Sequence, residues 1–146
     1  MLKTLGKLVL FVSGGLLLLG AIAVGTFWWF LHSTAQEMCG NEILSITDLI
    51  DHEARAIVFQ RDCGATTGFS TQVSILRLGE ELPNEVGNTF IADRNNGKAP
   101  KGKGGGPEVR VEAVSTNTFK ITYHPNAKVF KQQSKWNGVI IEYGNL

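Results

Sequence analysis

A cysteine stands beside hydroxyl residues in "QRDCGATTGFSTQVSIL", residues 60–76, the most distinctive stretch of the chain. A cysteine thiol acts as a nucleophile when a nearby base removes its proton, and His52 and His124 are the candidate bases for Cys63. One hypothesis from this stretch is therefore an enzyme that uses Cys63 with a histidine. The spacing alone does not bring these residues together, because catalytic groups meet in space and not in sequence.

The second hypothesis pairs Cys63 with Cys39, the other cysteine of the chain. An even number of cysteines in an oxidising compartment favours a disulfide, and the flanking charges discussed below place both cysteines outside the cytoplasm. A bridge between residues 24 positions apart would stabilise the fold by roughly 3–4 kcal/mol. We expect this disulfide, with two free thiols as the remaining alternative.

Other chemistry has less support. Thr66 and Thr67 lack the G-x-S-x-G elbow of a hydroxyl nucleophile. Two cysteines and three scattered histidines lack the short paired spacings of a metal site. Residues 97–104 nearly match a phosphate-binding loop, but Gly104 replaces its Ser or Thr and a strand-like segment follows. We therefore expect no metal, no nucleotide and no other cofactor.

The chain begins with a segment suited to a membrane. Residues 8–31 are 24 uncharged residues, about 36 Å of helix, which is enough to cross a hydrocarbon core of about 30 Å. We expect residues 1–32 to form a membrane anchor and residues 33–42 to form a neck. A cleaved signal peptide is the competing interpretation, since residues 33–35 resemble a cleavage site, although the apolar run is about twice the usual length.

Charges on either side of this segment predict its direction. Two basic residues precede it, and five acidic residues follow before the next basic one, Arg55: Lys3 and Lys7, then Glu37, Glu42, Asp48, Asp51 and Glu53. The positive-inside rule places the amino terminus in the cytoplasm and the remaining chain outside. Without those two lysines the chain has 12 basic and 13 acidic residues, a balance that gives no support to nucleic-acid binding.

Two small residues of the anchor, Ala21 and Gly25, are four positions apart. Such a pair permits close packing against a partner helix. Small residues at this spacing are also common in ordinary membrane helices, so an anchor without a helix partner remains the alternative.

The remaining residues, 43–146, divide into short segments separated by glycine, proline and asparagine. Segments typical of strands are residues 54–61, 70–78, 88–93, 108–114, 118–124 and 137–143. Two of them, 108–114 and 118–124, alternate apolar and polar residues, which predicts one face in water. In 70–78, Gln72 and Ser74 alternate with Val73 and Ile75 in the same way. We expect a mainly β domain: a small antiparallel sandwich or open barrel.

Residues 93–107 form the one long connection of this domain, rich in glycine and lysine. The stretch has no apolar run, so we expect a mobile loop. Its four basic residues are a candidate interaction site for anionic lipid headgroups or an acidic partner: Arg94, Lys98, Lys101 and Lys103. A solvated linker between strands is the alternative.

Three stretches carry a resemblance: "AIVFQRDCGATTGFSTQVSIL", "GNTFIAD" and "NGVIIEY". Together they resemble a family of small, uncharacterised bacterial envelope proteins, membrane-anchored or lipoprotein-like, with a strand-rich domain around a CGATT-type core. The similarity covers about residues 54–143. One departure is "IDHEAR" before the first strand, where an S-P-D-G-K-type turn is expected. The resemblance implies the fold and a place in the bacterial inner membrane, and it implies no activity.

These observations predict a single-pass membrane protein whose outer β-domain binds another envelope protein or a cell-wall component. An inhibitor, an immunity protein or an accessory subunit of a membrane complex belongs to this class. The enzyme hypothesis on Cys63 remains the alternative, and a disulfide between Cys39 and Cys63 would argue against it.

Overall fold

The computed structural model describes the backbone of residues 2–37, 39–64 and 68–146. It describes the side chains of residues 14–31, 39–64 and 68–146. The chain divides into two units, Met1–Met38 and Cys39–Leu146.

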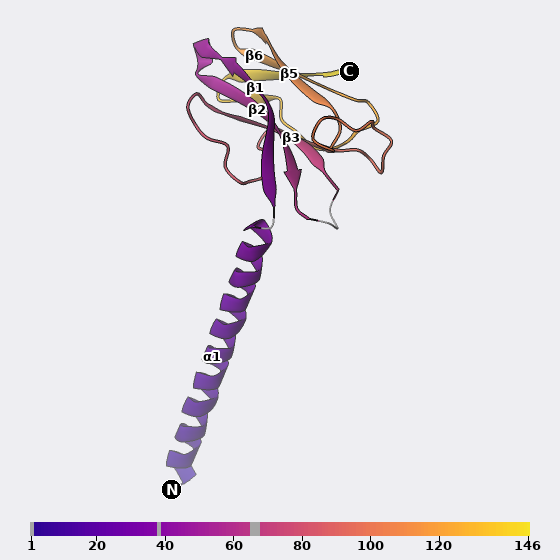
Figure 1. Ribbon diagram of the computed structural model, residues 1–146. Coiled ribbons are helices and arrows are strands. Elements are labelled where there is room, and N and C mark those ends of the chain that lie inside the picture. Colours follow the sequence, from indigo (N-terminus) through magenta and orange to yellow (C-terminus); the bar gives the residue numbers. More distant parts are fainter. Residues whose placement is uncertain (1, 38, 65–67) are drawn as a thin grey trace. The chain divides into compact units, whose positions relative to one another are not determined.

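The first unit is one continuous helix, α1, which spans Leu2–Glu37 (Figure 1). Its segment Gly14–Leu31 has a mean hydropathy of 1.8, and none of it is buried. At 1.5 Å per residue these 18 residues extend about 27 Å. This length and composition suit a membrane anchor, and they suit a signal sequence equally well.

The boundary between helix and β-domain differs from the expected one. The helix continues past residue 32 to Glu37, and β1 already begins at Gly40. The residues expected as a neck, 33–42, therefore belong mostly to these two elements. No glycine or proline interrupts residues 33–37, so the helical ladder has no local reason to end earlier.

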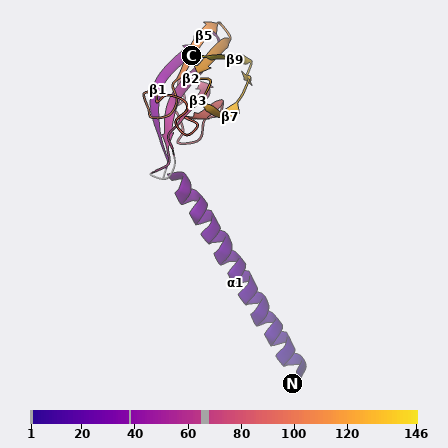
Figure 2. The ribbon, with the colours of Figure 1, turned by 90° about the vertical axis from the view of Figure 1, so that its right-hand side faces the viewer.

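The second unit consists of nine described strands in two sheets. The first sheet has the order β1-β2-β3-β4-β7 and the second β5-β6-β9-β8 (Figures 1 and 2). The strand bounds are β1 Gly40–Leu49, β2 Ala54–Asp62, β3 Ser70–Arg77, β4 Phe90–Asp93, β5 Val109–Ser115, β6 Thr118–Tyr123, β7 Lys128–Gln132, β8 Lys135–Trp136 and β9 Val139–Asn145. A single 3-10 turn, Ile50–His52, joins β1 to β2. The mainly β fold is confirmed, and an open sandwich describes the two sheets.

A hydrophobic core lies between the sheets. Alternate residues of β2 and β3, such as Val58 and Ile75, face Phe119 and Ile121 of β6. We call this face of each sheet its inner face and the opposite one its outer face. The expected wet face is confirmed for β5, where Arg110 is exposed between the buried Val109 and Val111 and Glu112 is exposed after Val111.

Strand pairing is antiparallel except between β6 and β9, which run parallel. The antiparallel expectation is therefore correct for every described pair but this one. The exception arises because the chain leaves the second sheet after β6, adds β7 to the first sheet, and returns through β8. Parallel neighbours need such a crossover, which local sequence patterns do not reveal.

The end of the glycine-rich stretch 93–107 packs against the first sheet. Thr71 Oγ1 donates a buried hydrogen bond of 2.7 Å to the carbonyl oxygen of Pro107. A Cβ atom on Gly106 would lie 2.5 Å from Thr71 Oγ1. Glycine at this position thus lets the backbone of the stretch approach the strand, a contact that composition does not predict.

Candidate functional site

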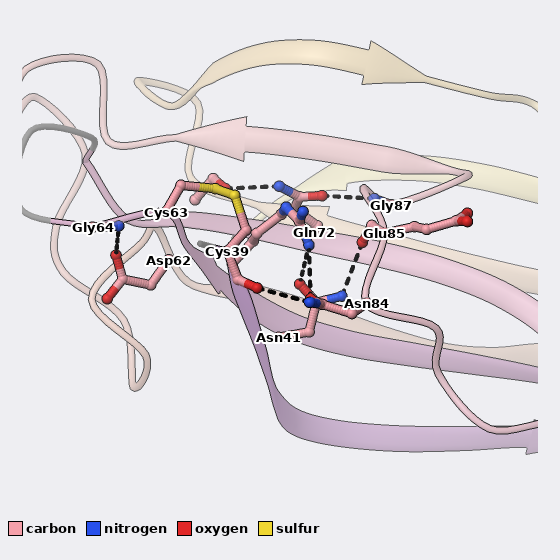
Figure 3. Close-up of a disulfide and its surroundings, with 11 residues drawn as sticks. Cys39, Asn41, Asp62, Cys63, Gly64, Gln72, Asn84, Glu85 and Gly87 are labelled. Carbon is pink, nitrogen blue, oxygen red and sulfur yellow. Dashed lines mark hydrogen bonds between the residues drawn. A yellow bond between two sulfur atoms is a disulfide. The ribbon is translucent and has the colours of Figure 1, made fainter. Parts of the chain in front are cut away.

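The disulfide links Cys39 to Cys63, with an S–S distance of 2.04 Å (Figure 3). It joins the residue before β1 to the residue after β2, next to the paired residues Gly40 and Asp62. The predicted disulfide is confirmed. No free cysteine exists among the described residues, so Cys63 has no thiol with which to act as a nucleophile in this state.

The candidate bases lie elsewhere. His52 is in the turn that joins β1 and β2, at the end of this hairpin opposite to the disulfide. His124 Nδ1 accepts a hydrogen bond of 3.1 Å from the backbone N–H of Asn126 within its own turn. Thr66 and Thr67 lie outside the described residues. No group of three possible metal ligands occurs in the described part of the chain.

Residues 78–89, which we call the covering segment, lie over the outer face of the first sheet. Asn41 Nδ2 donates to the carbonyl oxygens of Pro83 and Glu85 at 3.0 and 2.9 Å. Asn84 Nδ2 donates to the carbonyl oxygen of Cys39 at 2.8 Å (Figure 3). These bonds attach the covering segment to the start of β1, beside the disulfide.

A buried arginine completes this attachment. Arg61 is 6% exposed, and its Nη1 donates to Asn41 Oδ1 at 2.7 Å and to Asn84 Oδ1 at 3.3 Å. The two asparagines thus use their amide hydrogens on backbone carbonyls and their oxygens on one guanidinium. Removing Asn41 would leave the Nη1 of the buried Arg61 with only the longer bond, 3.3 Å, to Asn84.

The same segment is fixed to β3 by side chains that substitute for a neighbouring strand. Asn88 Oδ1 accepts the N–H of Ile75 at 2.9 Å, and Asn88 Nδ2 donates to the carbonyl of Ile75 at 2.8 Å. Gln72 Oε1 accepts the N–H of Gly87 at 2.6 Å. As a result Ile57 and Phe59, on the outer face, are 2% and 0% exposed.

Gln72 and Ser74 alternate with Val73 and Ile75, a pattern typical of a strand with one face in water, yet both polar residues are buried. They are 4% exposed because the covering segment lies over them. Two features of the sequence could have indicated this burial: the length of the connection between β3 and β4, and its asparagines, whose side chains commonly bond to backbone groups.

β1 is the last strand of the first sheet, so one edge of its backbone pairs with no described strand. A groove lies on each side of this edge. The outer groove, about 530 Å³, has an apolar floor of Ile43, Ile46 and Ile57 and is bordered by Gly79–Leu82. Ile43 and Ile46 are each 49% exposed, a high value for isoleucine in a folded domain.

The inner groove, about 620 Å³, lies between β1 and the start of β5. It is lined by Leu44 and Ser45 of β1, by Lys101 and Lys103, and by Val109. Thus two of the four predicted basic residues, Lys101 and Lys103, border β1. The other two do not: Arg94 Nε donates to the carbonyl of Ala99 in its own turn at 3.1 Å, and Lys98 is exposed outside both grooves.

The two grooves differ in charge. Arg55, which lines the outer groove, donates two hydrogen bonds to Asp48, at 2.8 and 2.9 Å, and these bonds lower the pKa of Asp48 from its ordinary value. Glu80 and Glu81 form no ion pair within the described residues, so this groove has an excess of negative charge.

In the inner groove Glu108 is paired with Arg110 at 2.6 Å. The excess there is the positive charge of Lys101 and Lys103. An apolar, acidic groove and a basic groove therefore flank one strand edge.

The predicted helix-packing pair, Ala21 and Gly25, lies on exposed positions of α1. A Cβ atom on Gly25 would meet nothing within 4 Å, so this surface is open. Its use for helix packing stays a prediction.

Comparison with known protein families, curated proteins and solved structures gave no match, so the function of this site is argued from its geometry.

Proposed function

We propose that this chain is a single-pass envelope protein whose β-domain binds another protein by adding an extended segment of it to the free edge of β1. The observation that carries this proposal is the pair of grooves of opposite charge on the two sides of that edge. Strand addition uses the backbone groups of an edge strand for affinity and pockets for alternate side chains for specificity.

The expected ligand follows from the alternation of side chains along a strand. Every second residue of the added strand would enter the outer groove, where apolar or basic side chains suit Ile43, Ile46 and the nearby glutamates. The residues between them would enter the inner groove, where small, apolar or acidic side chains suit Leu44 and the two lysines. The ligand is thus an extended polypeptide with two chemically different faces.

Location in the bacterial inner membrane belongs to the same proposal. The apolar helix serves as an uncleaved anchor, with its amino terminus in the cytoplasm because basic residues precede it and acidic residues follow it. The disulfide supports an oxidising compartment for the β-domain. We also propose the relationship to envelope proteins with a CGATT-type core on the motif alone.

The test places a photo-crosslinking amino acid at Ile43 or at Ser45 of the full-length protein in its native membrane. Ile43 lines the outer groove and Ser45 the inner one. If a strand adds to β1, both positions will crosslink to nearby residues of one polypeptide segment, and the two sets of crosslinked residues will point to opposite faces of the added strand. The matched control is Val114, which is 49% exposed but lies on β5 in the second sheet.

Mass spectrometry of the crosslinked peptides distinguishes the outcomes. Capture at unrelated sites, or at a rate equal to that of Val114, would contradict strand addition at β1. A membrane preparation without the crosslinker provides the background.

A further inference from the structure

We propose that the segment added to β1 is β7 of a second copy of this chain. This inference rests on the proposed function and names its partner. β7 ends the first sheet on the side opposite to β1, so each copy presents both a free β1 edge and a free β7 edge. Joining β7 of one copy to β1 of the next would continue one sheet across the two molecules.

The side chains of β7 suit the grooves. Phe130 is 56% exposed, and Lys128 Nζ lies 4.9 Å from the centre of its ring. An aromatic ring and a lysine together are the complement of an apolar groove bordered by glutamates. The outer groove of β1 has this character.

The faces also correspond. Lys128 pairs with Asp93, and Val129 pairs with Ala92, which points into the core. Val129 is therefore on the inner face and Lys128 on the outer face. A register shift leaves Phe130 without a paired residue on β4, and its contact with Lys128 places its ring on the outer face. A continued sheet keeps its faces, so Phe130 and Lys128 would meet the outer groove of the next copy and Val129 the inner one.

Strand direction supports a β7–β1 contact over a contact between two β1 edges. Every pair in the first sheet is antiparallel, so β1, β3 and β7 run in the same direction. β7 would pair parallel to β1 of its neighbour, and both copies would then point the same way. This arrangement would place the first residues of β1 of both copies at the same end of the shared sheet, which suits two chains that both enter the β-domain from one membrane.

Two β1 edges related by a twofold axis perpendicular to the sheet would instead run antiparallel. The two domains would then point in opposite directions. This arrangement would also bring the glutamates of the two outer grooves toward each other, which like-charge repulsion opposes.

The test uses two differently tagged full-length copies in one membrane. Copy A carries the photo-crosslinker at Ile43, and copy B is unchanged or carries Phe130→Asp, Lys128→Glu or Lys135→Glu. We expect a crosslink from Ile43 of copy A to residues 128–131 of copy B. Phe130→Asp should reduce it at least about tenfold and Lys128→Glu about two- to fivefold.

Two controls sharpen this result. Lys135→Glu reverses an exposed charge on β8 in the second sheet and should leave the yield unchanged. Glu81→Lys in copy A should lower the yield with unchanged copy B and restore it with Lys128→Glu, because the charges are then exchanged.

Each other outcome overturns a defined part of the proposal. A crosslink of Ile43 to a different protein overturns the second copy as partner and leaves strand addition standing. A crosslink to β1 of copy B overturns the β7–β1 contact. No crosslink from Ile43 above the Val114 background overturns both the partner and the proposed function.

Discussion

Strands β2 and β5 both alternate their side chains between two faces, yet β2 is buried on both faces and β5 on one. The inner faces of both strands lie against the shared core. The difference lies outside the core, where the covering segment lies over β2 and no described element lies over β5. An irregular segment can thus act as a third layer when asparagine and glutamine side chains satisfy its backbone groups.

Removing a large side chain beneath the covering segment tests whether the outer face of β2 stabilises the domain as the core does. Phe59→Ala should lower the free energy of unfolding by about 3–5 kcal/mol, as much as Phe119→Ala in the core, because both rings are fully buried. Urea unfolding of the full-length protein in detergent measures the effect. Val114→Ala is the control and should change stability by no more than about 0.5 kcal/mol. A cost for Phe59→Ala near that of the control would mean that the outer face is no second core.

Loss of the disulfide should affect the first sheet more than the second. Replacing Cys39 and Cys63 by serine should cost about 2–5 kcal/mol, because the unfolded chain loses a constraint. Hydrogen exchange should rise first at Gly40–Ile43, at the open end of the β1–β2 hairpin, and remain low in β6. An equal rise in both sheets would show that the bridge stabilises the domain as a whole.

A smaller effect tests whether side chains substitute for a strand on the outer face. Asn88→Ala removes both bonds to the backbone of Ile75 and should cost about 1–3 kcal/mol. Asn126→Ala, at an exposed asparagine with no side-chain bond among the described residues, is the matched control. If both variants unfold at the same urea concentration, the covering segment does not depend on this contact.

The smallest effect concerns the ion pair of the outer groove. Hydrogen bonds from Arg55 lower the pKa of Asp48 below its ordinary value. This contribution to stability is therefore present above the ordinary pKa of about 3.9 and is lost as the pH falls through the lowered one. NMR titration of the carboxyl group should find a higher pKa for Asp48 in Arg55→Gln. An unchanged pKa would mean that the pair is not formed in solution.

Local patterns predicted the parts of the fold that depend on neighbours in sequence. Alternation identified the wet face of β5, and the count of cysteines identified the disulfide. Alternation in 70–78 did not predict that Gln72 and Ser74 are buried, because their burial depends on a segment that comes later in the chain. Alternation shows which face of a strand is polar, but segments distant in the sequence determine whether that face is covered.

The candidate site was less predictable than the fold. Lys101 and Lys103 were identified as interaction residues from charge, but their place beside β1 follows from the packing of residues 93–107 onto the first sheet. Ile43 and Ile46 lie outside the segments that the sequence predicts as strands, so their exposure at a sheet edge was not foreseen. An edge exists only once the order of the strands is known.

For the membrane anchor proposed above, the position of the disulfide has a mechanical consequence. A pull on the chain from the anchor reaches the β-domain at Cys39, directly before the first residue pair of the β1–β2 ladder. Applied there without the bridge, tension would open the ladder one pair at a time, starting with Gly40 and Asp62. The covalent bond to Cys63 shares the load with β2 before any hydrogen bond of the ladder is stretched, so the domain resists being unzipped from its tethered end.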